Sequence, residues 1–130
     1  MAKVLMVIAP TGFRDEEFFE PKEIIEQHGH EVIVASKGVS AATGKLGGEQ
    51  DVDIDIKDAD PKDYDAIIFV GGPGATVFFS DSNAHRIAKD MHRNNKIVAA
   101  ICIGPSVLAN AGMLKGKKAT AFPSEDKNLK

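Results

Sequence analysis

Residues 65–74 read DAIIFVGGPG, an unbroken apolar run that passes directly into a turn of three glycines and one proline. A continuous apolar run bounded by turn residues is typical of a strand buried on both faces of a parallel sheet. Three other runs share this pattern: KVLMVIA at 3–9, EVIVAS at 31–36 and IVAAI at 97–101. The sequence therefore predicts a mostly parallel sheet that contains these four strands.

Amphipathic stretches separate the strands and predict the helices of βαβ units. A helix is expected around 16–28, with a break or a fresh start at Pro21, because proline removes a helical hydrogen bond. Gly29 is expected to end this helix in the left-handed conformation. Further helices are predicted at 83–94 and 104–111. The fold class that follows is α/β, a three-layer sandwich with a mostly parallel, flavodoxin-like sheet.

The segment 51–56, DVDIDI, alternates strictly between aspartate and aliphatic residues. Such alternation predicts a half-buried strand in which Val52, Ile54 and Ile56 face a core and the aspartates face water. The carboxylates that follow are interpreted as solvated faces rather than as a calcium site, because no glycine interrupts them. One more strand is predicted at 118–122.

Length, charge and cysteine content exclude several classes of protein. The 130 residues are expected to form one domain, 1–130, and 16 Lys and Arg against 19 Asp and Glu give a net charge of −3. That charge excludes a nucleic-acid binder with a broad basic surface. The longest apolar runs, such as 98–103, are far shorter than the roughly 20 residues that cross a bilayer. One cysteine, Cys102, excludes a disulfide framework and a multi-cysteine zinc site, so we expect a cytoplasmic protein that binds neither nucleic acid nor membrane.

Cys102 follows the apolar strand at 97–101 without a spacer, and Gly104 and Pro105 open a helix immediately after it. A strand–residue–helix turn this tight is a nucleophile elbow, which projects its side chain at the carboxyl edge of the sheet. The helix N-terminus stabilises the thiolate, which is the reactive form of cysteine. The alternative is a small buried hydrophobic residue, a common environment for a free cysteine. The tight turn and the glycine-rich loop expected beside it favour a functional cysteine.

The loops at the carboxyl ends of parallel strands border the ligand crevice of an open α/β sheet. In this sequence those loops are 10–17, 71–75 and 102–105. The backbone N–H groups of Gly72 and Ile103 are candidates for an oxyanion hole. The alternative interpretation of the glycines is a tight exit turn, and the loop matches no nucleotide-binding fingerprint.

The four histidines are poor candidates for a general base or a metal site. His28 and His30 flank a helix–strand turn, where solvated side chains are the default. His85 and His92 are seven residues apart on one helix face, two turns below the expected crevice.

The segment VAAICIGPSVLANAGMLKGKKATAFPS at 98–124 resembles the nucleophile segment of the ThiJ/PfpI superfamily. This superfamily has the class I glutamine amidotransferase-like fold and includes intracellular protease I-like and DJ-one-like proteins. The spacing from IIFVGG at 67–72 to Cys102 is similar as well, and so is FRDEE at 13–17 followed by Pro21. The resemblance covers nearly all of the chain and rests on several motifs together.

In that superfamily a glutamate on the first loop or helix hydrogen-bonds the nucleophilic cysteine. Counted through Phe13 and Pro21, the resemblance places this glutamate at Glu17, with Glu16 a poorer fit. Two anions in contact would suppress each other's ionisation, so we expect a protonated Glu17 beside the Cys102 thiolate. A neutral carboxyl that donates to sulfur stabilises the thiolate and can also carry a proton.

The chain departs from the superfamily pattern in two ways, at both histidine positions and in its length. Intracellular protease I-like members carry His directly after the cysteine, where this chain has Ile103. DJ-one-like members carry His in a Thr-x-His-Pro segment, where it has Phe122. A Cys–His–Glu peptidase triad is therefore not expected. Members usually continue past the region of Pro123 with further helices and strands, so the domain at 1–130 is expected to lack the usual C-terminal elements.

The resemblance implies a cysteine-dependent enzyme that acts on reactive carbonyls, of the glyoxalase III or deglycase kind. Its catalytic candidates are Cys102, which would add to an aldehyde carbon, and Glu17, which would move the proton. Gly72 and Ile103 are the candidate oxyanion hole, and no cofactor or metal is expected. The partner is a small carbonyl substrate or a glycated protein. Two alternatives stay open: a non-catalytic redox sensor or stress-protective protein that uses oxidation of Cys102, and an intracellular cysteine peptidase.

The resemblance also implies a homodimer or a higher homo-oligomer. Phe18, Phe19, Phe78 and Phe79 are candidates for an exposed apolar contact surface. Alternatively, both pairs complete the core, although adjacent side chains point in different directions from the backbone.

Overall fold

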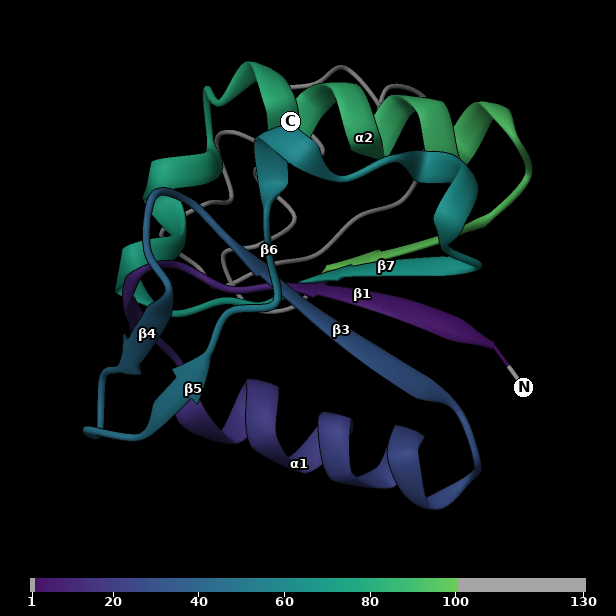
Figure 1. The fold of residues 1–130 in the computed structure, drawn as a ribbon. Helices are drawn as coiled ribbons and strands as arrows, with labels where there is room; N and C mark the ends of the chain where they lie inside the picture. The colour runs from purple at the N-terminus through teal and green to yellow at the C-terminus, as the bar shows by residue number, and fades with distance from the viewer. Residues whose placement is uncertain (1, 101–130) are drawn as a thin grey trace.

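The computed structural model describes residues 2–100, which form a three-layer α/β sandwich (Figure 1). A parallel sheet in the order β6-β3-β1-β7-β8 makes the central layer. Its strands are β1 (Lys3–Val7), β3 (Glu31–Ser36), β6 (Ile54–Asp55), β7 (Ala66–Phe69) and β8 (Ile97–Ala100). Helix α1 (Asp15–Gln27) covers one face and helix α2 (Ser82–Arg93) covers the other. The predicted fold class and the four predicted strands of the sheet are confirmed.

The core lies where the two helices pack on the middle strands. In β1, Leu5 pairs with Ile33 of β3 on one side and with Ile67 of β7 on the other. Leu5 and Ile67 are fully buried. Since a strand covered on both faces needs apolar side chains at every position, these runs lack polar alternation. Burial of each such side chain contributes roughly 1.5–3 kcal/mol.

A second, smaller sheet lies beside the start of α1 (Figure 1). Its strands are β2 (Thr11–Phe13), β4 (Ala41–Gly44) and β5 (Glu49–Asp51), and β4 and β5 form an antiparallel hairpin. The sequence predicts a loop where β2 lies, because three residues with a central glycine carry no strand pattern. Strand β2 pairs with β4 of this hairpin, and the Thr43 N–H donates to the carbonyl of Pro10, directly before β2, at 3.0 Å.

The alternating segment 51–56 does not form one strand, because β5 and β6 are separate. Ile56 is buried, as its alternation predicts. Asp51 and Asp53 are exposed, as predicted, whereas Asp55 is half-buried. The exposed Asp53 carboxylate also accepts the Val34 N–H at 2.8 Å. The same side chain that continues the alternation therefore also satisfies a backbone group of β3.

Helix α1 continues through Pro21 without a break, so the predicted interruption is wrong. Proline lacks only the N–H that would donate to the Glu17 carbonyl. The fully buried Phe18 holds that turn against the sheet. Gly29 follows the helix with φ +83° and donates to the Glu26 carbonyl at 3.0 Å, as predicted.

Helix α2 confirms the predicted helix at 83–94 to within one residue at each end. Its buried stripe consists of Ala84, Ile87, Ala88 and Met91. Three 3-10 turns complete the described elements: η1 (Ile56–Asp58), η2 (Pro61–Asp63) and η3 (Pro73–Phe78). Arg86 of α2 donates to the Ala59 carbonyl at 3.2 Å and so fastens the helix to the loop between η1 and η2.

The four phenylalanines predicted as a contact surface form two adjacent pairs, and the two members of each pair differ in burial. Phe18 and Phe78 are buried, whereas Phe19 and Phe79 are partly buried against the core. The prediction of exposure is therefore wrong for Phe18 and Phe78. Adjacent residues point in different directions, so one member of each pair reaches the core and the other stays near its rim.

Several predictions fall on residues that the structure does not describe. The helix at 104–111, the strand at 118–122 and the nucleophile elbow at Cys102 all lie outside residues 2–100. Within the described part of the chain, neither helix is long and apolar enough to span a bilayer.

Candidate functional site

The order of the strands places the candidate site at the carboxyl ends of β1 and β7. After β1 the chain adds β3 and then β6 on one side, and it later adds β7 and β8 on the other. In open α/β sheets the loops diverge at such a reversal, so a ligand is expected to bind at the carboxyl edge here. The loop from β1 to α1 and the loop from β7 to η3 lie at this edge, at the left of Figure 1.

Backbone packs directly on backbone where these two loops meet. The Arg14 N–H donates to the Gly71 carbonyl at 3.0 Å. A Cβ on Gly72 would lie 2.4 Å from the Arg14 nitrogen, and a Cβ on Gly74 would lie 1.8 Å from the Thr11 oxygen. Gly72 also has φ +105°, a conformation that strains any residue with a side chain. The tight-turn interpretation of these glycines is therefore correct.

The same geometry leaves the Gly72 amide suited to a second task. The Gly72 carbonyl accepts the Ala75 N–H at 3.0 Å, whereas the Gly72 N–H donates to no other described residue. Because glycine has no side chain, a ligand oxygen can approach this amide closely. The other predicted oxyanion donor, Ile103, lies outside the described residues, as does Cys102.

Glu17 lies in the first turn of α1, at the same edge of the sheet. Its side chain is only 14% exposed, and Oε2 lies 3.1 Å from Nη1 of Arg14. Oε1 is buried and has no hydrogen-bond partner among the described residues. A buried carboxyl oxygen without a partner is unfavourable, so Oε1 marks a position where a proton donor or acceptor is expected.

Glu16, which fits the superfamily spacing less well, lies in different surroundings. Its side chain is 47% exposed, and its Oε2 lies 3.6 Å from Nε of Arg14. Consecutive side chains on a helix point about 100° apart, so only one of these two glutamates can turn toward the sheet. The structure separates the two and turns Glu17 inward.

Arg14 connects the two predicted site residues that the structure describes. Its backbone N–H holds the loop that carries Gly72, through the Gly71 carbonyl, and its guanidinium pairs with Glu17. Glu17 and Gly72 therefore lie at one edge, as the sequence predicts, and are joined through a residue that no sequence pattern singled out.

Asp15 is a second residue of this edge that no sequence pattern identifies. Its buried carboxylate accepts the N–H groups of Leu46 and Gly48, each at 2.9 Å. A Cβ on Gly44 or Gly48 would collide with it. The hydrogen bond from Leu46, and then that from Gly48, lowers the pKa of Asp15. Asp15 thus ties the β4–β5 turn to the first turn of α1. The glycines of the β4–β5 turn were the sequence feature that could have indicated this close approach.

One histidine lies closer to this edge than its sequence position suggests. His85 is in the first turn of α2, not two turns below the carboxyl edge. Its Nε2 lies 2.8 Å from the Phe79 carbonyl, which occupies that ring nitrogen. Within residues 2–100, no three His, Cys, Asp or Glu side chains gather as metal ligands.

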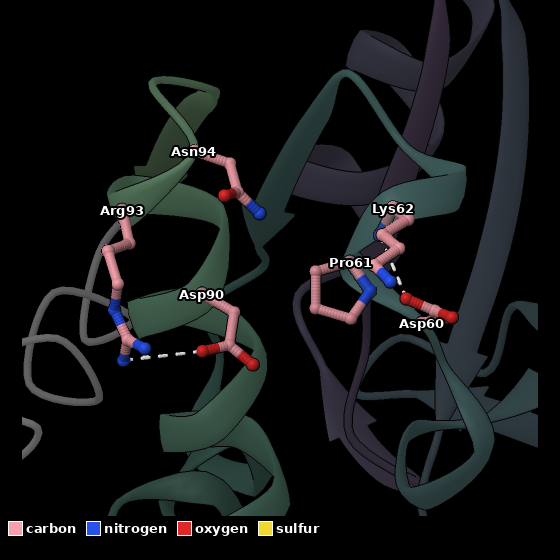
Figure 2. A pocket seen from close by; sticks show the side chains of 6 residues that line it. All are labelled: Asp60, Pro61, Lys62, Asp90, Arg93 and Asn94. Carbon is pink, nitrogen blue, oxygen red and sulfur yellow. Dashed lines mark hydrogen bonds and ion pairs between the residues drawn. The ribbon is translucent and has the colours of Figure 1, made fainter.

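A pocket of about 250 Å³ lies at the opposite, amino edge of the sheet, between η2 and the end of α2 (Figure 2). Three of its four charged side chains, those of Asp60, Asp90 and Arg93, are already engaged. Asp90 pairs with Arg93 at 3.3 Å, and the Asp60 carboxylate accepts the Lys62 N–H at 3.0 Å. The lining residues are Asp60, Pro61, Lys62, Asp90, Arg93 and Asn94. Glu17 does not line this pocket and lies at the other edge of the sheet.

Comparison with known proteins adds four findings. The family described as DJ-1/PfpI matches residues 2–130. An uncharacterised protein of Methanocaldococcus jannaschii is 46% identical over 126 residues, which cover 96% of this chain and 62% of that protein. A deglycase of Thermococcus kodakarensis is 38% identical over 117 residues, which cover 90% of this chain and 70% of that protein. A solved ThiJ/PfpI domain protein from Brachyspira murdochii is similar with a TM-score of 0.94 and 35% identity, over 98% of this chain and 73% of that one.

Proposed function

Because the chain belongs to the DJ-1/PfpI family, we propose that it is a cysteine-dependent enzyme acting on reactive carbonyl compounds. Cys102 is the proposed nucleophile and Glu17 the proposed proton carrier. The N–H groups of Gly72 and Ile103 form the proposed oxyanion hole. The name of the Thermococcus relative, a deglycase, supports a carbonyl substrate.

The observation that carries the proposal is the unpartnered Oε1 of Glu17. This oxygen is buried at the carboxyl edge, while Oε2 is held by Arg14. A carboxyl group in that state can accept a proton from a nearby group and return it. Strand β8 pairs with β7 up to Ala100, which lies opposite Phe69, so the described chain ends beside the strand that leads into the Gly72 loop.

The proposed reaction begins with transfer of the Cys102 thiol proton to Oε1 of Glu17. This transfer gives a thiolate beside a neutral carboxyl and avoids two adjacent anions. A sulfur electron pair then forms a bond to the aldehyde carbon, and the π electrons of the carbonyl move to its oxygen. The Gly72 and Ile103 N–H groups stabilise this oxyanion. Glu17 returns the proton to it and gives a neutral hemithioacetal. Glu17 then transfers a proton from the former aldehyde carbon to the adjacent carbonyl carbon through the enediolate, and water hydrolyses the resulting thioester, which releases a hydroxy acid and regenerates the Cys102 thiol.

The test measures consumption of methylglyoxal by the full chain. The wild type should act faster than a free thiol at the same concentration, and Cys102→Ser should remove that excess. Glu17→Gln should slow consumption at least about tenfold, because it removes the group that carries the proton. Glu16→Gln is the matched control, and it should stay within about twofold of wild type since Glu16 is half-exposed.

Two outcomes would contradict the proposal. One is a wild type that consumes methylglyoxal no faster than the free thiol. The other is an equal loss of activity in Glu16→Gln and Glu17→Gln, because the proposal depends on the inward position of Glu17 alone.

A further inference from the structure

We propose that Arg14 is a positioning residue that aims the Glu17 carboxyl into the crevice and locks it to the loop that carries Gly72. The inference rests on the proposed function, in which Glu17 carries the proton. Arg14 itself takes no part in bond making, and its role is to fix one atom, Oε1 of Glu17, in place.

The first support is that Arg14 makes two contacts, one through its backbone and one through its side chain. Its N–H donates to the Gly71 carbonyl at 3.0 Å, and its Nη1 lies 3.1 Å from Oε2 of Glu17. The proton carrier and the oxyanion loop come from segments more than fifty residues apart in the sequence. Arg14 is bonded to both, so a change in its side chain alters the position of one relative to the other.

The second support is the unequal surroundings of the two Glu17 oxygens. Oε2 is paired with Arg14, and Oε1 is buried with no partner among the described residues. Without the guanidinium, a carboxyl in the first turn of a helix would gain hydration by turning outward, as Glu16 does at 47% exposure. The ion pair opposes that rotation and so keeps Oε1 in the crevice.

The third support is the chemistry of arginine. Its planar fork presents several N–H groups in fixed directions, and here Nη1 is directed to Glu17 while Nε lies 3.6 Å from Glu16. A lysine ammonium would supply the charge without these directions. Because the Arg14 side chain is 47% exposed, the pair contributes little to folding. Loss of the pair is therefore expected to change the reaction rate rather than the stability of the fold.

The experiment is a double-mutant cycle between Arg14 and Glu17, read by two assays. One assay is methylglyoxal turnover, and the other is the rate of Cys102 alkylation by iodoacetamide, which requires no turnover. Arg14→Gln should lower kcat and the alkylation rate about tenfold and leave KM within about twofold, because it misplaces the proton carrier rather than the substrate. Arg14→Lys should recover only part of the loss.

Energetic coupling between the Arg14 and Glu17 substitutions distinguishes a positioning role of Arg14 from a merely structural one. The Arg14→Gln, Glu17→Gln double variant should be no slower than Glu17→Gln alone. Glu16→Gln touches the same guanidinium and should remain within about twofold of wild type. Thermal unfolding of every variant should stay close to wild type, which shows that the fold is retained.

Additive effects of the Arg14 and Glu17 substitutions would overturn the inference, and so would full activity in Arg14→Gln. Equal losses in Arg14→Gln and Glu16→Gln would overturn it as well. If the wild type fails to consume methylglyoxal while alkylation still shows the coupling, the positioning role of Arg14 stands and the proposed function fails. The two claims are thus decided separately.

Discussion

The two edges of the parallel sheet differ in whether certain of their polar groups have hydrogen-bond partners. At the carboxyl edge, Oε1 of Glu17 is buried without a partner among the described residues, and the Gly72 N–H donates to none of them. At the amino edge, Nζ of Lys96 donates to the Pro61 carbonyl at 2.8 Å and to the Tyr64 carbonyl. These groups of the amino edge have their partners, whereas the two groups of the carboxyl edge have none among the described residues, as the proposed function requires.

The pocket at the amino edge reinforces this contrast. It is lined by charged side chains, yet the Asp90–Arg93 pair and the Asp60 turn already engage its principal groups (Figure 2). A cavity by itself is therefore a weaker sign of function here than an unsatisfied buried atom. Substitutions at the amino edge should change stability alone, and substitutions at the carboxyl edge should change chemistry.

The largest expected effect is that of Gly72→Ala. The new Cβ would lie 2.4 Å from the Arg14 nitrogen at φ +105°, so the two loops must separate. We expect a loss of about 3 kcal/mol or more in the free energy of unfolding, measured by urea denaturation, together with loss of turnover. Gly29→Ala is the control at the amino edge: it shares a positive φ but has open space around it, and should lose only about 1 kcal/mol.

Lys96→Met should destabilise the protein by about 1–2 kcal/mol without changing turnover. The substitution keeps an apolar stem of similar length but leaves the carbonyls of Pro61 and Tyr64 without their donor. Urea denaturation and methylglyoxal consumption, measured on the same preparation, check both parts. If Lys96→Met lost turnover but kept full stability, the proposed division between a structural amino edge and a functional carboxyl edge would be wrong.

Lowering the pH should loosen the β4–β5 turn through Asp15. The N–H groups of Leu46 and Gly48 lower the pKa of Asp15 in the folded protein, so its stabilising contribution is present above its unfolded pKa and is lost as the pH falls through the folded value. Stability measured from pH 6 to pH 3 should therefore fall below about pH 4. Asp15→Asn should flatten this fall. Part of the slope should persist, because hydrogen bonds from Gly38 and Lys57 also lower the pKa of Asp55.

The smallest expected effect on stability is that of Glu17→Gln, which should remain within about 1 kcal/mol of wild type. The lost ion pair with Arg14 is weak because the arginine is half-exposed. Urea denaturation measures the stability of this variant. Nearly unchanged stability together with a loss of activity would identify Glu17 as a functional carboxyl rather than a structural one. A large destabilisation would mean that Glu17 belongs to the framework of the edge.

Much of the fold could be predicted because its signals are local. The buried strands and α2 follow from apolar periodicity, and Gly29 from the conformation that glycine permits. The uninterrupted course of α1 through Pro21 could not be predicted, since the packing of Phe18 against the sheet decides it. Strand β2 could not either, because three residues have no periodicity of their own.

For the candidate site, the sequence pointed to Glu17 and Gly72 through a resemblance and through the place of their loops at the ends of strands. It did not point to Arg14 or Asp15. The Asp15 contacts join residues 31 and 33 positions apart, and such hydrogen bonds leave no local pattern. Only the packed loops show that one guanidinium holds Glu17 while the same residue's backbone holds Gly71.

By itself, then, the sequence determined strands β1, β3, β7 and β8, the places of helices α1 and α2, and the edge of the sheet at which the candidate residues gather. Those properties depend on the periodicity of burial and on chain direction, which neighbouring residues encode. The tertiary structure decided which glutamate turns inward and which of its oxygens stays unpaired. Such choices depend on atoms that distant segments bring within about 3 Å, the distance at which a hydrogen bond is made or left unmade.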